Sequence, residues 1–375
     1  MPTITLQETR IDALTGEFAY YDRWVESLDL PIYEGYYVED LRTLGLGRWD
    51  QRGVDAAFLQ LAGQQGVSGV YVTEVRPGDT TPPFKMAIDE CIYVLSGSGL
   101  TTVHGTDSGT KKTFEWQKYS MFMIPANHTY QISNTSGNQP LRLLHSNYLP
   151  LAMSVIPNHD FYFNNPVVES ERIVANEDGE FYSIARAFDR PAGPGRPPQT
   201  WVGNFFPDMR AWDQLVAFKG RGGGGTAVYI EFPHSPMMAH MSVFPPQSYK
   251  KAHRHGGGFV IVIPAGEGYS VMWQDENAEK IMIPWHEASC FVPPFRWFHQ
   301  HFNVSEHPDR YLAIHPPRGL SSSGEGVQDP TKDQIEYVDE DPWIRRTFEA
   351  ELAKRSLKSV MPDQAYKDKN YEWSY

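Results

Sequence analysis

The feature that most constrains this chain is an internal repeat. When the 375-residue sequence is shifted by 169 positions, its two β-rich regions align without a gap. The identities at this single offset are Gly97/Gly266, Gly99/Gly268, Trp116/Trp285, Ser120/Ser289, Phe122/Phe291, Pro125/Pro294 and Asn134/Asn303. Turn glycines and large aromatic residues fix the connections and the packing of strands. A repeat of this kind predicts a duplicated β-domain.

Both copies consist of short apolar runs separated by Gly and Pro, which is the pattern of β-strands joined by turns. The run DPWIRRTFEAELAKRS near the C-terminus predicts a helix, with Asp341 placed to cap it. We therefore expect an N-terminal extension, a first β-domain, a connector, a second β-domain and a C-terminal tail, over 1–55, 56–156, 157–225, 226–318 and 319–375.

Composition excludes several classes of protein. The formal net charge is -13 and no Lys/Arg-rich run interrupts it, so a nucleic-acid-binding footprint is not expected. The N-terminus lacks the pattern of a signal peptide, and no stretch of about 18 apolar residues predicts a membrane helix. The two cysteines, Cys91 and Cys290, cannot form a disulfide framework. We expect a cytoplasmic protein without a membrane or nucleic-acid partner.

The second copy carries a candidate metal site in the segment KAHRHGGG. His253 and His255 are two residues apart, so on a strand both side chains point to one face. His299 follows in the segment PPFRWFHQHFNVS. Imidazole nitrogens suit divalent Fe, Cu, Ni, Zn and Co, so these three histidines are the predicted ligands.

At these residues the sequence resembles the cupin superfamily. Its first motif is matched by His253, His255 and the closing Gly266, and its second by Pro294, His299 and Asn303. Three motif positions depart from the family pattern: Gln247 and Arg296 replace glycines, and Phe259 replaces the glutamate ligand. The resemblance implies an all-β-dominated fold of two tandem cupin barrels (double-stranded β-helices, or jelly rolls) with helical N- and C-terminal extensions.

The first copy fits the same template without the histidines. Phe84 and Met86 stand at the positions of the paired histidines, Tyr130 stands at the third, and Glu90 and Asn134 remain. The fold therefore does not require imidazoles at these positions. Their presence in the second copy favours a function over packing, and we expect one metal site per chain.

A site of three neutral imidazoles leaves a divalent ion with its full charge and open positions, which favours an anionic chelating substrate. Among cupins such a centre resembles that of Fe(II) dioxygenases, with gentisate- and salicylate-type enzymes as the nearest comparison. The resemblance implies C–C bond cleavage with O2 in a hydroxylated aromatic acid or diketone, and a homo-oligomer. Two alternatives stay open: a non-redox isomerase, decarboxylase or lyase with Zn, Mn or Ni, and a non-catalytic storage or ligand-binding bicupin. Copper is a further candidate metal.

Other residues of the two motifs are candidates for the site. His301 would face the same side of its strand as His299 and could act as a base or hydrogen-bond donor, although a structural role is equally open. Arg296 could clamp a substrate carboxylate. The remaining candidates are the polar pocket residues Gln247 and Tyr249 and the apolar walls Phe259, Trp273 and Trp297.

Overall fold

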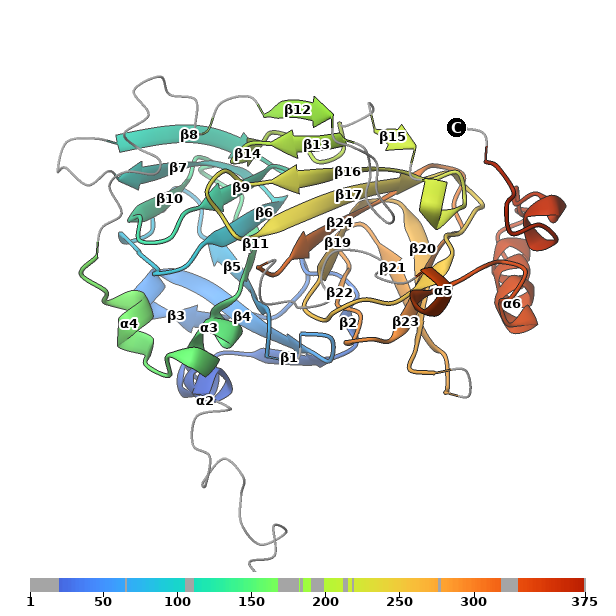
Figure 1. Cartoon of the computed structure of the whole chain (residues 1–375). Coiled ribbons are helices and arrows are strands. Elements are labelled where there is room, and N and C mark those ends of the chain that lie inside the picture. Colours follow the sequence, from blue (N-terminus) through green and yellow to red (C-terminus); the bar gives the residue numbers. More distant parts are fainter. Residues whose placement is uncertain are drawn as a thin grey trace, which may run out of the picture.

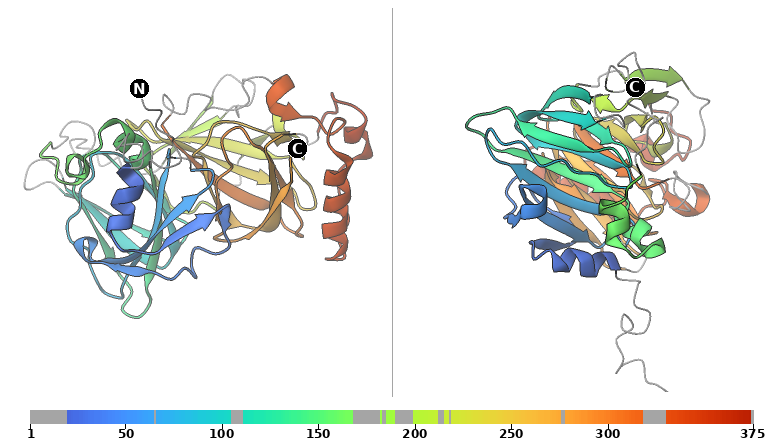
Figure 2. Two further views of the ribbon diagram at one scale, coloured as in Figure 1. Left: turned by 90° about the horizontal axis from the view of Figure 1, so that it is seen from below. Right: turned by 90° about the vertical axis from the view of Figure 1, so that its left-hand side faces the viewer.

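The structure is a computed structural model, and it describes residues 20–64, 66–104, 111–167, 182, 185–189, 199–211, 215–217, 219–275, 278–317 and 330–373. Two β-barrels lie side by side, and helices lie at the two ends of the chain (Figure 1). Figure 2 shows from a second direction that the C-terminal helix lies beside the second barrel, at the far end from the first.

The first barrel is built from one large and one small sheet. The large sheet has the order β1-β4-β5-β11-β6-β9-β14, with β3 paired to β4, and the small sheet has the order β10-β7-β8. These strands are β1 Ile32–Gly35, β3 Gly47–Trp49, β4 Val54–Leu61, β5 Gly69–Val75, β6 Glu90–Ser96, β7 Ser98–His104, β8 Lys111–Gln117, β9 Met121–Ile124, β10 Tyr130–Asn134, β11 Leu141–Asn147 and β14 Phe205–Phe206.

The second barrel repeats this plan. Its large sheet has the order β12-β13-β16-β17-β24-β19-β22-β2, with β15 paired to β16, and its small sheet has the order β21-β20-β23-β18-β25. These strands are β2 Tyr37–Val38, β12 Arg186–Asp189, β13 Gln199–Val202, β15 Val216–Ala217, β16 Thr226–Glu231, β17 Met238–Phe244, β18 Ala252–His253, β19 Val260–Ala265, β20 Glu267–Trp273, β21 Ile281–His286, β22 Cys290–Phe291, β23 Phe298–Asn303, β24 Asp309–His315 and β25 Gln334–Ile335.

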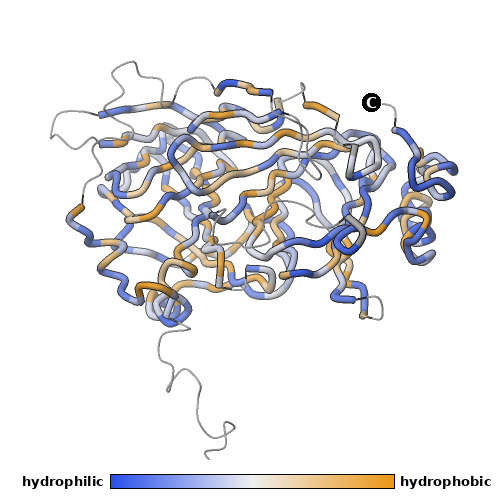
Figure 3. The backbone as a smooth tube through the Cα atoms, viewed as in Figure 1, coloured by the Kyte–Doolittle hydropathy of each residue, from blue (hydrophilic) through white to orange (hydrophobic). Residues whose placement is uncertain are grey.

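Strand alternation explains why these segments form half-buried sheets. Along β8, Phe114 and Trp116 are buried while Lys111, Glu115 and Gln117 are exposed, which is the period of two that a one-sided sheet requires. Figure 3 shows hydrophobic and hydrophilic residues alternating along the barrel strands. By contrast, β6 is buried at every residue but the last, because it lies inside the large sheet.

Strands exchanged between the two halves hold the barrels together. β2, which lies in the N-terminal extension, pairs with β22 of the second barrel, and β14, which lies in the connector, pairs with β9 of the first. A single hydrophobic cluster contains side chains from both barrels, among them Val70, Leu144, Val228 and Leu312. The barrels therefore share one core between their large sheets.

The repeat extends to individual side-chain hydrogen bonds. The indole N–H of Trp116 donates to Thr101 at 2.9 Å, and that of Trp285 donates to Ser270 at 3.0 Å. The side-chain amides of Asn134 and Asn303 each bridge two backbone carbonyls, and one of these, that of Val75 or Phe244, is equivalent in the two barrels. The predicted duplication is therefore present in three dimensions, and the predicted fold of two tandem cupin barrels is confirmed.

Helices lie in both terminal extensions, as predicted, and two more follow β11. They are α2 Tyr20–Ser27, α3 Leu149–Val155, α4 His159–Phe163, α5 Pro330–Asp333 and α6 Pro342–Ala353. The carboxylate of Asp341 accepts a hydrogen bond from the backbone N–H of Trp343 at 2.8 Å, which confirms the predicted cap of the C-terminal helix. Within the described residues, no helix is long and apolar enough to cross a membrane.

Candidate metal centre

The three predicted ligands meet at one end of the second barrel. His253 ends β18, and it lies directly opposite His299 of β23 in the antiparallel ladder. His255 follows two residues later, in the turn after β18. One ring nitrogen from each histidine lies within 4.8 Å of the others, which is a spacing that a single ion could bridge. His253 and His299 are buried and His255 is half-buried.

Backbone carbonyls orient all three rings. The Nδ1 atoms of His255, His299 and His253 lie 2.7, 3.2 and 3.4 Å from the carbonyl oxygens of Gly256, Trp297 and Lys251. Because a carbonyl can only accept, each Nδ1 carries the proton and each Nε2 keeps its lone pair. This is the arrangement in which a histidine binds a metal through Nε2.

The imidazoles are held in the neutral form that a metal requires. Burial, reinforced by Arg221 and the neighbouring histidines, keeps the pKa of His253 well below its ordinary value. Burial does the same for His299 and lowers the pKa of His255 to about 4. An ion entering the site at neutral pH therefore displaces few protons.

Phe259 occupies the place where the cupin pattern has a carboxylate. Its ring centroid lies 4.2 Å from that of His255 and 4.4 Å from that of His315. The metal-binding group found among the described residues contains the three histidines without a carboxylate. These residues fit a divalent ion with an imidazole preference, such as Fe, Zn, Cu or Ni, better than one with a carboxylate preference.

Two cations are buried in the same barrel. The ammonium group of Lys250 donates to Ser242 and lies 3.4 Å from the Tyr311 hydroxyl, and burial together with Arg221 lowers the pKa of Lys250 to about 7. Burial lowers the pKa of Arg221 to about 10, so its guanidinium stays charged at neutral pH. The sequence interpretation missed both residues, although Lys250 lies only three positions before His253.

His301 lies near the three ligands. Its ring centroid is 5.6 Å from that of His299 and 6.3 Å from that of His253. Its Nδ1 shares a 2.8 Å hydrogen bond with the Ser270 hydroxyl, which also accepts from the Trp285 indole. The equivalent position in the first barrel is Ile132, so this contact is specific to the second barrel, where it orients the His301 ring.

Tyr249 and Trp273 lie on the other face of the strands from the histidines, so their prediction as pocket residues is corrected. Tyr249 stacks on Phe302 at 4.9 Å, and Trp273 stacks on Phe298 at 5.7 Å. Phe298 and Phe302 alternate with His299 along β23 and therefore point away from the ligands. Both aromatic residues belong to the hydrophobic cluster beneath the C-terminal helix.

Arg296 is engaged in an ion pair through one terminal nitrogen, and its role as a substrate clamp stays a prediction. Asp333, just before β25, accepts from Arg296 and also from the Nε of Arg254 at 3.0 Å. Asp333 thus ties both metal motifs to the segment that follows residue 329. No local pattern signals this contact, because 79 residues separate Asp333 from Arg254.

Gln247 lies away from the three ligands, whereas Trp297 lies two residues before His299. The carbonyl of Gln247 accepts from the backbone N–H of Val360, and the next residue, Ser248, pairs with Asn303, four residues along β23 from His299. At 3.3 Å per residue this puts Gln247 on the order of 13 Å from the ligands, which corrects its predicted place in the pocket. The half-buried Trp297 packs at 6.1 Å from Tyr36 of the N-terminal extension.

Comparisons with known proteins agree with the fold. A family model described as auxin binding protein matches residues 38–162, which span most of the first barrel. No curated protein matches the chain.

Solved structures of similar fold include oxalate decarboxylases. A mutant of the Bacillus subtilis enzyme is 11% identical with a TM-score of 0.45 and covers 74% of this chain and 76% of its own. The Lactobacillus farciminis enzyme in its formate complex is 11% identical with a TM-score of 0.46, covering 83% and 92%. A B. subtilis structure described for its Mn(II) centres is 11% identical with a TM-score of 0.47, covering 83% of each chain.

Proposed function

We propose that this protein is a metal-dependent enzyme that cleaves a C–C bond in a small anionic substrate able to chelate the ion. The observation that carries the proposal is the charge of the second barrel. Three neutral imidazoles are gathered without a carboxylate, and a buried arginine and a buried lysine lie in the same barrel. An ion held there keeps its full charge, so a substrate carboxylate is the natural partner.

The protein residues have separable roles in this proposal. His253, His255 and His299 would hold the ion, and the ion when bound would polarise a coordinated carboxylate or hydroxyl group as a Lewis acid. Phe259 walls one side of the ligands and excludes water from it. Arg221 supplies a fixed positive charge toward a substrate anion, and the Ser270 contact of His301 keeps that imidazole oriented for a hydrogen bond.

The first candidate reaction is oxidative cleavage of a hydroxylated aromatic acid or diketone with Fe(II) and O2. The all-imidazole ligand set supports it, since this set suits iron and leaves positions open for a bidentate substrate. The second candidate is decarboxylation without O2, with Zn, Mn or Ni. The Lys250 ammonium supports this one, because a pKa of about 7 suits a group that delivers a proton at neutral pH.

The experiment that separates these reactions compares the purified protein with and without O2. Protein reconstituted with Fe(II), Zn, Mn or Ni would be incubated with hydroxybenzoates, catechols, diketones and small dicarboxylates. Oxygen uptake matched by product formation supports the dioxygenase, and anaerobic CO2 release that is strongly reduced in Lys250→Gln supports the decarboxylase. If the protein binds no stoichiometric metal and leaves a bound ligand unchanged, both reactions are contradicted. The result would then favour a non-catalytic ligand-binding bicupin.

A further inference from the structure

The first barrel keeps the geometry of the metal motif while changing its chemistry. Phe84 and Tyr130 form a bridge that is equivalent to the pairing of His253 with His299. Glu90 stands at the position that Phe259 holds in the second barrel. The first barrel thus keeps the carboxylate of the motif and replaces its imidazoles.

A buried guanidinium lies among these replaced residues. The Arg52 guanidinium carbon is 3.5 Å from the ring centroid of Phe84, and its Nη2 donates to the Tyr130 hydroxyl at 2.7 Å. Its Nη1 donates to the Tyr71 hydroxyl at 2.8 Å, and Arg52 is only 7% exposed. The Arg52 guanidinium therefore contacts Phe84 and Tyr130, which stand at two of the three positions that the histidines hold in the second barrel.

Glu90 balances this cation indirectly. The hydroxyls of Tyr71 and Tyr130 accept from Arg52 and donate to the two carboxylate oxygens of Glu90. Within the described part of the chain, Nη1 and Nη2 of Arg52 each have one acceptor. Among the described residues, no acceptor contacts the Nε–H or the second N–H of either terminal nitrogen.

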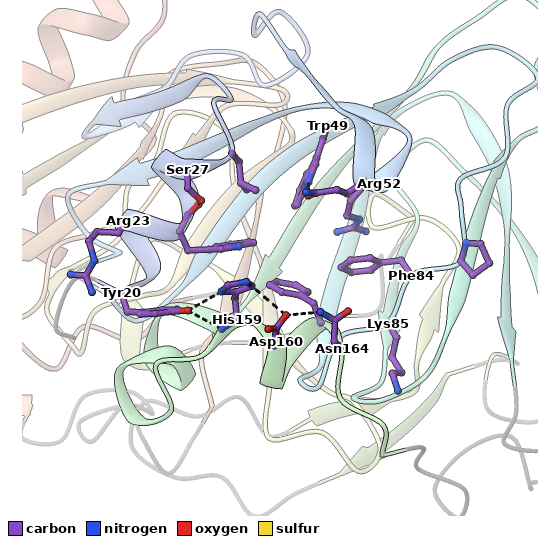
Figure 4. A pocket seen from close by; sticks show the side chains of 15 residues that line it. Tyr20, Arg23, Ser27, Trp49, Arg52, Phe84, Lys85, His159, Asp160 and Asn164 are labelled. Atoms are coloured by element: carbon purple, nitrogen blue, oxygen red, sulfur yellow. Dashed lines mark hydrogen bonds and ion pairs between the residues drawn. The ribbon is translucent and has the colours of Figure 1, made fainter. Parts of the chain in front are cut away.

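Arg52 lines a cleft of about 700 Å³ between α2, α4 and the first barrel. Figure 4 shows Trp49, Arg52 and Phe84 on one side of this cleft, facing Tyr20 and His159 across it. Trp24 and Phe163, which stack on each other at 5.0 Å, add aromatic surface. Arg23 and Lys85 add positive charge, and the Lys85 ammonium donates to the carbonyls of Asn165 and Val167. The one carboxylate of the lining, that of Asp160, accepts from Asn164 at 2.6 Å and pairs with His159 at 3.8 Å.

We propose that this cleft is a second binding site, separate from the metal centre, and that its ligand is a small planar aromatic carboxylate. The volume lies within the usual range for small-molecule sites, which bury a ligand against aromatic walls and a few polar groups. A guanidinium matches a carboxylate through paired N–H donors. The tryptophan and phenylalanine rings supply the flat surfaces that an aromatic ring stacks on.

The proposal can be tested by titrating the chelator-treated full-length protein with benzoate and with neutral benzamide. We expect saturable benzoate binding by calorimetry, a change in tryptophan fluorescence from Trp24 and Trp49, and markedly weaker binding of benzamide. The double variant Arg23→Gln/Lys85→Gln should weaken benzoate binding by about tenfold, because it removes two positive charges from the lining of the cleft. The single variant Arg76→Gln, at the exposed position just after β5, is the matched control and should bind as the wild type does.

A second pair of variants separates this site from the metal centre. His253→Ala should leave benzoate binding unchanged. Arg52→Lys keeps the positive charge but loses the paired N–H donors of the guanidinium, so it should reduce benzoate binding. The proposal is overturned if benzoate and benzamide bind equally, if no saturable binding appears at millimolar benzoate, or if the double variant binds like the Arg76→Gln control. Loss of binding in His253→Ala would overturn it too, because the ligand would then occupy the second barrel.

Discussion

The substitution Glu90→Gln tests the buried charge network of the first barrel. Glu90 is 1% exposed, and its carboxylate accepts from Tyr71, from Tyr130 at 2.8 Å and from Asn147 at 3.3 Å. It also lies 3.2 Å from Nδ1 of His145. A glutamine keeps the shape but removes the only carboxylate that balances Arg52 within this described network. Breaking a buried charge pair by removing one partner costs about 3–5 kcal/mol.

The assay is chemical denaturation of the wild type, Glu90→Gln and the exposed control Glu115→Gln, followed by tryptophan fluorescence. We expect the free energy of unfolding of Glu90→Gln to fall by about 3 kcal/mol or more, and that of the control to change by less than about 0.5 kcal/mol. The double variant Glu90→Gln/Arg52→Met should recover much of the loss, because it removes both charges. A Glu90→Gln protein as stable as the control would refute the assigned network.

Three further predictions concern the second barrel. Phe259→Glu should add an anionic ligand and shift the relative affinity for divalent metals toward Mn by about tenfold or more. Metal analysis after competition between ions would measure this shift, and an unchanged ratio would mean that residue 259 does not face the ion. If the reaction is the proposed decarboxylation, kcat/KM of the wild type should fall above about pH 7, since deprotonation of the Lys250 ammonium removes the proton donor, and the residual activity of Lys250→Gln should lack this fall. A variant whose kcat/KM still falls above about pH 7 would assign the fall to another group. Asp333→Asn should weaken the ion pairs with Arg254 and Arg296 and lower the free energy of unfolding by about 1–3 kcal/mol. Proteolysis after residue 329 should then be faster, and an unchanged cleavage rate would contradict a stabilising role of these ion pairs.

The fold and the three ligands were predictable because they depend on local periodicity and on one internal comparison. The offset that aligns Trp116 with Trp285 also aligns their indole hydrogen bonds, so the repeated residues identify equivalent positions in space. The pairing of His253 with His299 follows from two motifs on neighbouring strands. None of this required knowledge of distant contacts.

The errors have a physical origin in strand irregularity and long-range contacts. Tyr249 is four residues before His253, so a continuous strand would place both on one face. The pairing register shifts by one residue between Tyr249, which is bridged to Phe302, and His253, which pairs with His299, so Tyr249 and His253 lie on opposite faces. Lys250 contacts Ser242 inside the barrel. The ion pairs of Arg296 and Arg254 depend on Asp333, and the cation of the first barrel comes from Arg52, which lies outside both repeated motifs. Such contacts leave no trace in local periodicity.

The most direct test of the central claim is the metal content of three proteins purified and reconstituted in parallel. The wild type should hold about one divalent ion per chain, His299→Ala should hold almost none, and Tyr130→Ala, the equivalent change in the first barrel, should keep the wild-type amount. Circular dichroism would establish that all three are folded. Equal metal loss in both variants, or full retention in His299→Ala, would contradict a single metal centre formed by His253, His255 and His299.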